Sequence, residues 1–134
     1  MSKLSMIEGI GEAYELKLKE AGIGSVEVLL EVCGKPKGRD DLALKSGISE
    51  KMILRWVNHA DLFRIKGIAG EYAELLEAAG VDTVIELGQR KPESFVAKLL
   101  AVNTAKKLVR QVPSVKQVEE WVAQADKLPR KVFY

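Results

Sequence analysis

The sequence is poor in the residues that build metal centres and catalytic sites. Among its 134 residues there are one histidine and one cysteine, so His59 lacks a second imidazole or a neighbouring thiol with which to ligate a metal ion. Cys33, being alone, forms no internal disulfide. No nucleophile, base and orienting group follow a recognisable pattern. We therefore predict that the protein is not an enzyme and has no catalytic and no metal-binding residues.

Long apolar runs are also absent. No stretch approaches the ~18 residues that a membrane span requires, and the opening residues MSKLSMIEG lack the apolar core of a secretion signal. We therefore expect a cytoplasmic protein without a membrane partner. The hydrophobic fraction of 47% is ordinary for a globular chain, and the net charge of +2 is too small to indicate a nucleic-acid partner by itself.

What the sequence does contain is an internal repeat. Residues 7–29 align with residues 65–87 at a shift of 58 positions, with nine identical residues in 23. Farther along, ILRWVNHAD aligns with VEEWVAQAD at a shift of 65, so the second copy has about seven additional residues. A repeat of this kind indicates two structural units. We predict a first copy over 1–62 and a second over 63–134, packed together as one compact protein.

Each copy has the spacing of amphipathic helices. Tyr72, Leu75, Leu76 and Ala79 recur on one helical face, and Gly80 follows where such a helix would end. Further helices are expected over 93–101 and 103–111. No stretch of alternating β-branched residues competes, so we predict an all-α fold. The candidate N-cap residues are Ser25, Thr83, Ser49 and Ser114.

The segment GKPKGRDD, residues 34–41, has the composition of a loop, with two glycines and a proline. We predict that it is a loop within the first copy and that it displays basic side chains.

A glycine-rich turn opens the first repeat block at GIG, residues 9–11. A dinucleotide-binding fingerprint would need a glycine where Tyr14 stands, and a P-loop would end in Gly-Lys-Ser/Thr. A short turn into a new helix remains, and the N–H groups at the start of that helix would attract an anion. The predicted hairpin turns contain Gly9, Ile10, Gly11, Gly67, Ile68, Gly70, Gly47 and Ile48.

These turns carry a resemblance to known proteins. GIG followed by a helix ending in EAGI, with a later SGIS opening a helix, resembles the helix-hairpin-helix unit. Two hairpins per copy resemble the N-terminal domain of archaeal recombinases. Nearly the whole chain is similar to a small bacterial domain family of unknown function built from two such copies, in which segments like RDDLALKSGISEKMILRWVNHADLFRIKGI recur.

The resemblance implies tandem helix-hairpin-helix repeats. From the wider helix-hairpin-helix class it implies sequence-independent contact between hairpin amides and the DNA backbone. In some members hairpin carbonyls hold a monovalent cation, and no other cofactor is expected.

Acidic residues crowd the first hairpin of each copy, where they stabilise a helix N-terminus and repel phosphate. Four acids stand against two lysines over 7–24, and four against Lys66 over 65–82. Between Ser94 and Val118 there is no acid at all. The basic residues that we predict to bind nucleic acid are Lys98, Lys106, Lys107, Arg110 and Lys116, with Lys35, Lys37, Arg39, Lys45 and Lys51 as a second set.

Two hypotheses for function follow. The first is a non-catalytic module that binds double-stranded DNA through the sugar-phosphate backbone. The second is a protein-interaction or scaffold module whose hairpins are only structural turns. The acidic hairpins and the apolar side chains of Val132, Phe133 and Tyr134 favour the second hypothesis.

Overall fold

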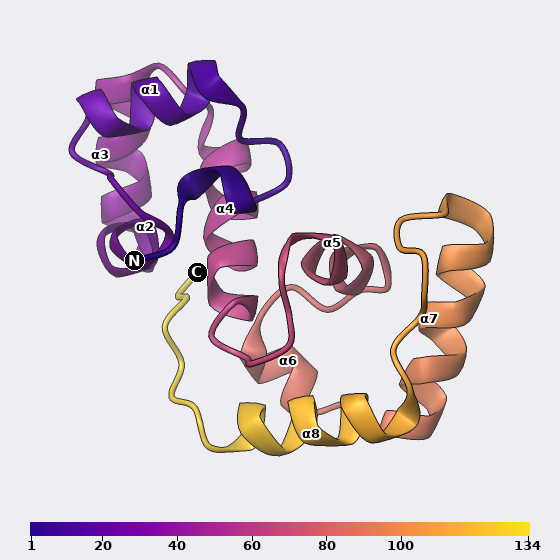
Figure 1. Ribbon diagram of the computed structural model, residues 1–134. Coiled ribbons are helices and arrows are strands. Elements are labelled where there is room, and N and C mark those ends of the chain that lie inside the picture. The colour runs from indigo at the N-terminus through magenta and orange to yellow at the C-terminus, as the bar shows by residue number, and fades with distance from the viewer. The chain divides into compact units, whose positions relative to one another are not determined.

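A computed structural model describes all residues, 1–134. The fold is all-α, as predicted: it has eight α-helices, one short 3-10 helix and no strand (Figure 1). No helix combines the length and the apolar character that crossing a membrane requires.

The chain forms two compact units. The first unit contains Met1–Asp61 together with Lys131–Tyr134, and the second contains Leu62–Arg130. The boundary at residue 61 falls inside a helix, and the last four residues belong to the first unit although the sequence division at 62/63 assigns them to the second copy.

In the first unit, the 3-10 helix η1 (Leu4–Met6) leads through a turn into α1 (Glu12–Glu20). Two helices follow, α2 (Val26–Cys33) and α3 (Pro36–Ser46), and they pack against each other. Helix α4 (Glu50–Leu62) completes the unit. Four of its apolar side chains recur at helical spacing and are buried: Ile53, Trp56, Val57 and Ala60.

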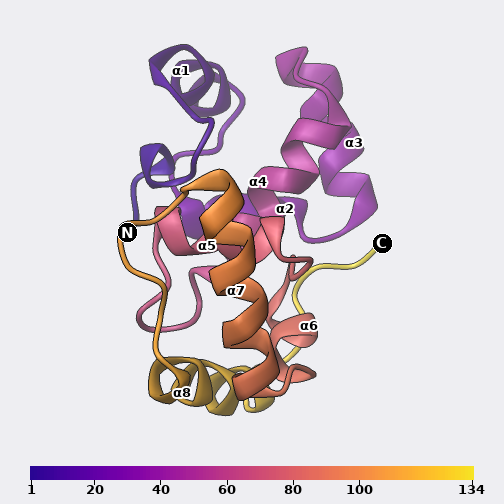
Figure 2. The ribbon, with the colours of Figure 1, turned by 90° about the vertical axis from the view of Figure 1, so that its right-hand side faces the viewer.

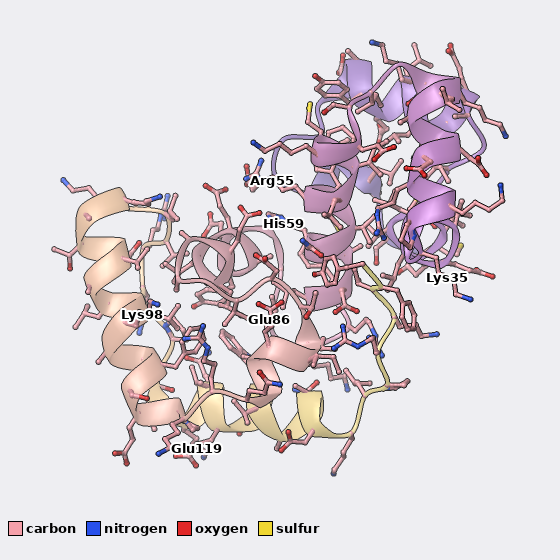
Figure 3. All side chains as sticks on the ribbon, turned by 180° about the vertical axis from the view of Figure 1, so that it is seen from behind. Lys35, Arg55, His59, Glu86, Lys98 and Glu119 are labelled. Carbon is pink, nitrogen blue, oxygen red and sulfur yellow. The ribbon has the colours of Figure 1, made fainter.

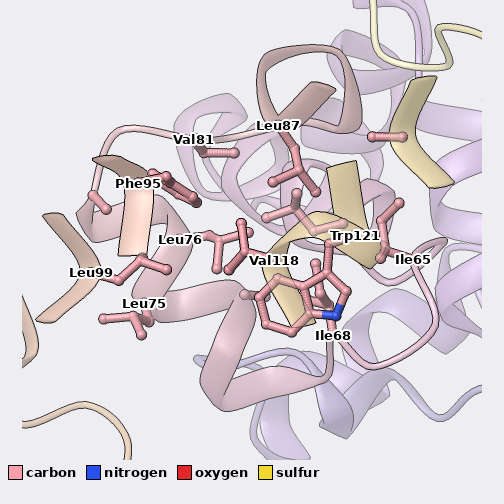
Figure 4. Packing of buried hydrophobic residues seen from close by; sticks show 14 of the residues in the cluster. Ile65, Ile68, Leu75, Leu76, Val81, Leu87, Phe95, Leu99, Val118 and Trp121 are labelled. Atoms are coloured by element: carbon pink, nitrogen blue, oxygen red, sulfur yellow. The ribbon is translucent and has the colours of Figure 1, made fainter. Parts of the chain in front are cut away.

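In the second unit, α5 (Gly70–Ala78) and the short α6 (Val84–Gly88) precede α7 (Pro92–Lys106) and α8 (Val115–Asp126). Helix α8 packs against α6 and α7, and α5 packs against α7. Figure 4 shows the core that they enclose, with Leu76, Phe95 and Trp121 among its members.

Serine side chains begin three helices where the sequence predicts them. The Oγ atoms of Ser25 and Ser49 accept hydrogen bonds from Val28 and Met52 at 3.1 and 3.2 Å. Ser114 forms a reciprocal capping box with Gln117. Thr83 occupies the N-cap position of α6, but its hydroxyl bonds to the Glu86 carboxylate instead of to a backbone amide.

Helices α1 and α5 end in the same hydrogen-bonded motif. The amide of Ile23 donates to the carbonyl of Leu18 at 2.8 Å, and the amide of Val81 donates to that of Leu76 at 2.9 Å. The preceding glycines, Gly22 and Gly80, have positive φ angles. This geometry is the Schellman motif, and in α5 it lies at Gly80, where the sequence predicts the helix to end.

The segment 34–41 is not a loop, in contrast to our prediction. From Pro36 onward it is the beginning of α3, with the proline in the first turn, where a helix tolerates it. Gly38 stands inside the helix because a Cβ atom there would lie 1.8 Å from the carbonyl oxygen of Val32. The glycine therefore permits close packing of α3 on the end of α2.

The helix predicted over 103–111 is also absent. Helix α7 continues unbroken to Lys106, and Lys107 ends it with φ 53° and ψ 47°. The amide of the Asn103 side chain then forms two hydrogen bonds with the backbone of Val109, at 3.0 and 2.9 Å. These bonds hold the following residues in an extended path that runs back along α7 to the start of α8 (Figures 1 and 2).

Candidate nucleic-acid interface

The first hairpin of each unit is a tight turn closed by a backbone hydrogen bond. The amide of Ile10 donates to the Ile7 carbonyl at 3.1 Å, and the amide of Ile68 donates to the Ile65 carbonyl at 3.2 Å. Gly9 and Gly67, third in each turn, have φ angles of +96° and +101°. Positive φ at this position is typical of a type II turn.

A tryptophan lies beneath each of these turns. The indole Nε1 atom of Trp121 would be 2.8 Å from a Cβ atom at position 67, so this turn needs glycine for space as well as for its backbone angles. Trp121 also packs against Tyr72, with ring centroids 5.4 Å apart. In the first unit Trp56 packs against Tyr14 in the same manner, with centroids 5.1 Å apart.

The helices that follow these turns begin with glycine or alanine instead of a side-chain cap. Gly11 is the N-cap of α1, Ala69 is the N-cap of α5, and Gly70 is the first residue of α5. Glu12 and Glu71 stand in the first turns. These carboxylates complement the positive end of the helix and oppose an approaching phosphate.

The later hairpin of the first unit joins α3 to α4. Gly47 ends α3 with φ +74°, and the adjacent Ile48 is buried. Lys45 lines a surface cavity of about 410 Å³ in which Lys17 and Glu20 also stand. The neighbouring helix ends thus mix both signs of charge around this turn.

Lys51, on the α4 side of the same hairpin, is close to acidic groups. It lines a cavity of about 330 Å³ with Asp40 and Glu50. The Asp40 carboxylate accepts a hydrogen bond from the protonated Glu50 carboxyl and repels its charged form, and both effects raise the pKa of Glu50. The two carboxylates beside Lys51 offset its positive charge, which weakens the attraction for phosphate at this position.

Of the three basic residues predicted in the 35–39 segment, Arg39 is not on the surface. Its exposed fraction is 6%, and its guanidinium donates to the carbonyls of Cys33, Gly34 and Phe133 at 3.0, 3.0 and 2.6 Å. It therefore joins three backbone carbonyls within the first unit and is not placed to meet a phosphate.

The other two basic residues of this segment are exposed. Lys37 pairs with Asp41 at 3.5 Å. The Nζ atom of Lys35 lies 6.0 Å from the ring centroid of Phe133, and Figure 3 shows Lys35 at the edge of the first unit. The segment therefore presents one unpaired cation instead of a cluster of three.

The five basic residues predicted to bind nucleic acid in the second unit fall into three places. Lys98 lies halfway along α7 (Figure 3), where its Nζ atom is 3.8 Å from the position of a Cβ atom on Gly80. Arg90, which the sequence analysis missed, is its neighbour and donates to the Gly80 carbonyl at 3.3 Å. Lys116 stands in the first turn of α8, followed by Glu119.

The remaining three, Lys106, Lys107 and Arg110, lie at the end of α7 and in the segment that follows it. We call these three residues the α7-end patch. All three side chains are exposed, and none forms an ion pair with a carboxylate. No acid occurs in the sequence around them between Ser94 and Val118.

The backbone beneath this patch is held firmly. Val109 is buried and bonded to the Asn103 side chain on both its N–H and C=O groups. The hydroxyl of Tyr72 donates to the Gln111 carbonyl at 3.2 Å. Ordered backbone lowers the entropic cost of presenting three cations to one partner.

Lys107 is the only residue other than glycine with a positive φ angle. A left-handed conformation costs an L-residue roughly 1–2 kcal/mol, which glycine avoids at a smaller entropic cost. We therefore expect Lys107→Gly to raise the free energy of unfolding by about 1 kcal/mol, measured by urea denaturation. Lys106→Gly, which places glycine inside α7, should lower it by a similar amount, and equal effects of the two substitutions would contradict this account.

Two observations concern the remaining groups with metal-binding or nucleophilic chemistry. No three histidine, cysteine or acidic side chains are grouped to hold a metal ion. Burial raises the pKa of the Cys33 thiol to about 11, so the nucleophilic thiolate is scarce at neutral pH.

Comparison with known proteins identifies a family. No solved structure matches the protein. A family model described as Domain of unknown function (DUF4332) matches residues 8–128, which is most of the chain and includes both hairpins and the α7-end patch. The chain therefore belongs to the DUF4332 domain family.

Proposed function

We propose that the protein is a non-catalytic module that binds the backbone of double-stranded DNA without reading its sequence, and that the α7-end patch is the main contact. The observation that carries this proposal is the exposure of Lys106, Lys107 and Arg110 on ordered backbone with no carboxylate paired to them. Phosphate contacts position a protein on DNA and carry no base information, which fits a patch made of cations alone.

The proposal also concerns the relationship between the two units. We infer that the two units are copies of one helix-hairpin-helix-like unit, since both place a glycine turn over a tryptophan that packs on a tyrosine. The second unit differs in its later hairpin, where the residues after Lys107 replace the short Gly47–Ser49 connection of the first unit. These additional residues contain Arg110, so the longer hairpin supplies part of the proposed contact.

Three phosphate contacts set the expected salt dependence. The slope of log K against log salt is about −0.9 for each neutralised phosphate, so three contacts give a slope of about −2.7. Affinity for a DNA duplex should then fall by roughly 40-fold between ~50 and ~200 mM salt. Fluorescence anisotropy with a labelled duplex of arbitrary sequence measures both quantities.

The variant Lys106→Glu/Lys107→Glu/Arg110→Glu should abolish measurable binding. Its control is Lys3→Glu/Lys19→Glu/Lys127→Glu, which changes the net charge equally at exposed positions that are not part of the patch. If the two variants lose affinity to the same extent, or if the unmodified protein does not bind at ~50 mM salt, the proposal fails.

A protein-interaction module is the second candidate. It is favoured by the carboxylates in the first turns of α1 and α5, which suit a basic protein surface better than a phosphate backbone. Pull-down with and without nuclease separates the two functions. A partner retained after nuclease treatment supports this candidate, and one lost with the nucleic acid supports DNA binding.

A further inference from the structure

The segment Lys131–Tyr134 lies against the first unit as a bound peptide would. Its backbone is not helical, and the residues of the first unit that it contacts are far from it in sequence. The amide of Phe133 donates to the Gly34 carbonyl at 2.7 Å. The Arg39 guanidinium donates to the Phe133 carbonyl at 2.6 Å. Both backbone groups of one residue are thereby satisfied by the first unit.

Side chains of the segment add apolar and aromatic contacts. Val132 is 1% exposed, so the first unit surrounds it almost completely. The Phe133 ring lies beside the Lys35 ammonium, and the Tyr134 hydroxyl is 3.4 Å from the Asn58 amide oxygen. A deeply buried side chain next to a residue whose backbone is hydrogen-bonded on both sides is a usual pattern of extended-peptide recognition.

The receiving surface is shaped for a backbone. A Cβ atom on Gly34 would be 2.3 Å from the carbonyl oxygen of Lys131, so only glycine lets the segment come this close. The Arg39 guanidinium also donates to the Cys33 and Gly34 carbonyls, and these hydrogen bonds fix the position from which it donates to Phe133. The site therefore has a fixed donor and acceptor pair, and the bound segment buries one apolar side chain, that of Val132.

We propose that the first unit contains a peptide-binding groove, formed by Gly34, Arg39 and Asn58, whose ligand is an extended segment with valine followed by two aromatic residues. In the structure the chain's own residues 131–134 occupy the groove. When that segment is withdrawn, the groove accepts the same segment from a second copy of the chain, because the contacts are identical in the two cases.

The segment reaches the groove over a short connection. The Arg64 guanidinium donates to the Pro129 carbonyl at 2.8 Å, which fixes the chain just before it leaves the second unit. A ligand tethered this closely has an effective concentration in the millimolar range. The groove of the unmodified chain should therefore be filled in cis and largely closed to a ligand added in trans.

The test uses the full chain with its own segment disabled. Val132→Asp places a charge where the structure buries an apolar side chain, which should expel the segment. The probe is a fluorescent peptide of residues 128–134, LPRKVFY. We expect saturable binding to the Val132→Asp chain, binding weaker by at least about tenfold to the unmodified chain, and a similar loss when the peptide itself carries Val132→Asp.

Two further measurements make the outcome decisive. If circular dichroism shows that the Val132→Asp chain is unfolded, the near-isosteric Val132→Thr chain takes its place. The same differences in peptide affinity are then expected, but smaller. In the unmodified chain, the Phe133 amide should exchange with solvent at least about tenfold more slowly than in the isolated peptide. Equal binding of the two peptides to a folded variant chain, or an unprotected Phe133 amide, would overturn the proposal.

Discussion

Gly38→Ala is expected to destabilise the first unit by roughly 3–5 kcal/mol, the largest effect of any single methyl group in the chain. The added Cβ atom would lie 1.8 Å from the carbonyl oxygen of Val32 and 3.3 Å from the Cα atom of Cys33. Both atoms belong to backbone, which cannot move aside as a flexible side chain would. Relief of the clash requires α3 to separate from the end of α2, and the packing between the two helices is then lost.

The chain offers a matched control and a local probe for this prediction. Gly24→Ala adds the same methyl group where no atom lies within 4 Å and should change stability by less than about 0.5 kcal/mol. Trp56 and Trp121 are the only tryptophans, one in each unit. Urea denaturation followed by fluorescence in a Trp121→Phe background therefore reports on the first unit alone. Equal midpoints for the two alanine variants would show that the helices separate easily.

The same glycine explains why the sequence misleads over 34–41. Glycine and proline within a few residues usually indicate a loop, because glycine lowers helix propensity and proline lacks an amide. Here Pro36 stands in the first helical turn and Gly38 faces a neighbouring backbone. Composition describes local preference only. The close approach of α2 is a tertiary contact, and it decides the conformation of this segment.

Local signals were sufficient where the determining contacts are local. The serine caps and the glycine that ends α5 act within a few residues, and the structure has them where the sequence predicts them. The end of α7 depends on Asn103 and Val109, which are also close in sequence, but no helix-ending glycine marks the position. Lys107 adopts the left-handed conformation instead. The second helix predicted over 103–111 is therefore replaced by the last turn of α7 and by non-helical residues bonded to the Asn103 side chain.

The positive charge of the candidate interface could be predicted from the sequence, but the positions of its side chains on the fold could not. The acid-free stretch between Ser94 and Val118 is visible in the sequence, and it contains the α7-end patch. The division of its cations among Lys98, Lys116 and the patch follows from the path of the chain after Lys107. Arg39 is lost from the predicted surface because its guanidinium bonds to the nearby Cys33 and Gly34 carbonyls and to Phe133, which is 94 residues away in the sequence. No periodicity or spacing reports a contact over that distance.

Arg39→Met is expected to lower the free energy of unfolding of the first unit by roughly 3 kcal/mol. Methionine fills much of the same volume but leaves the Cys33 and Gly34 carbonyls, at the end of α2, without their buried donor. Hydrogen bonds to a charged group contribute about 1.5–3 kcal/mol each, and a buried carbonyl left without a partner adds its desolvation cost. Lys37→Met, one helical turn from the same elements but on the surface, should change stability by less than about 0.5 kcal/mol.

A double-mutant cycle separates the two duties of Arg39. Deleting residues 131–134 removes the Phe133 carbonyl but leaves the two carbonyls at the end of α2 in place. In that background Arg39→Met should be less costly by about 1.5 kcal/mol, the contribution of one charged hydrogen bond, while the rest of its cost persists. A cost that is unchanged by the deletion would assign Arg39 to the α2–α3 junction alone. A cost that disappears would mean that the arginine serves only to hold the 131–134 segment, and the helix end would then need another explanation for its stability.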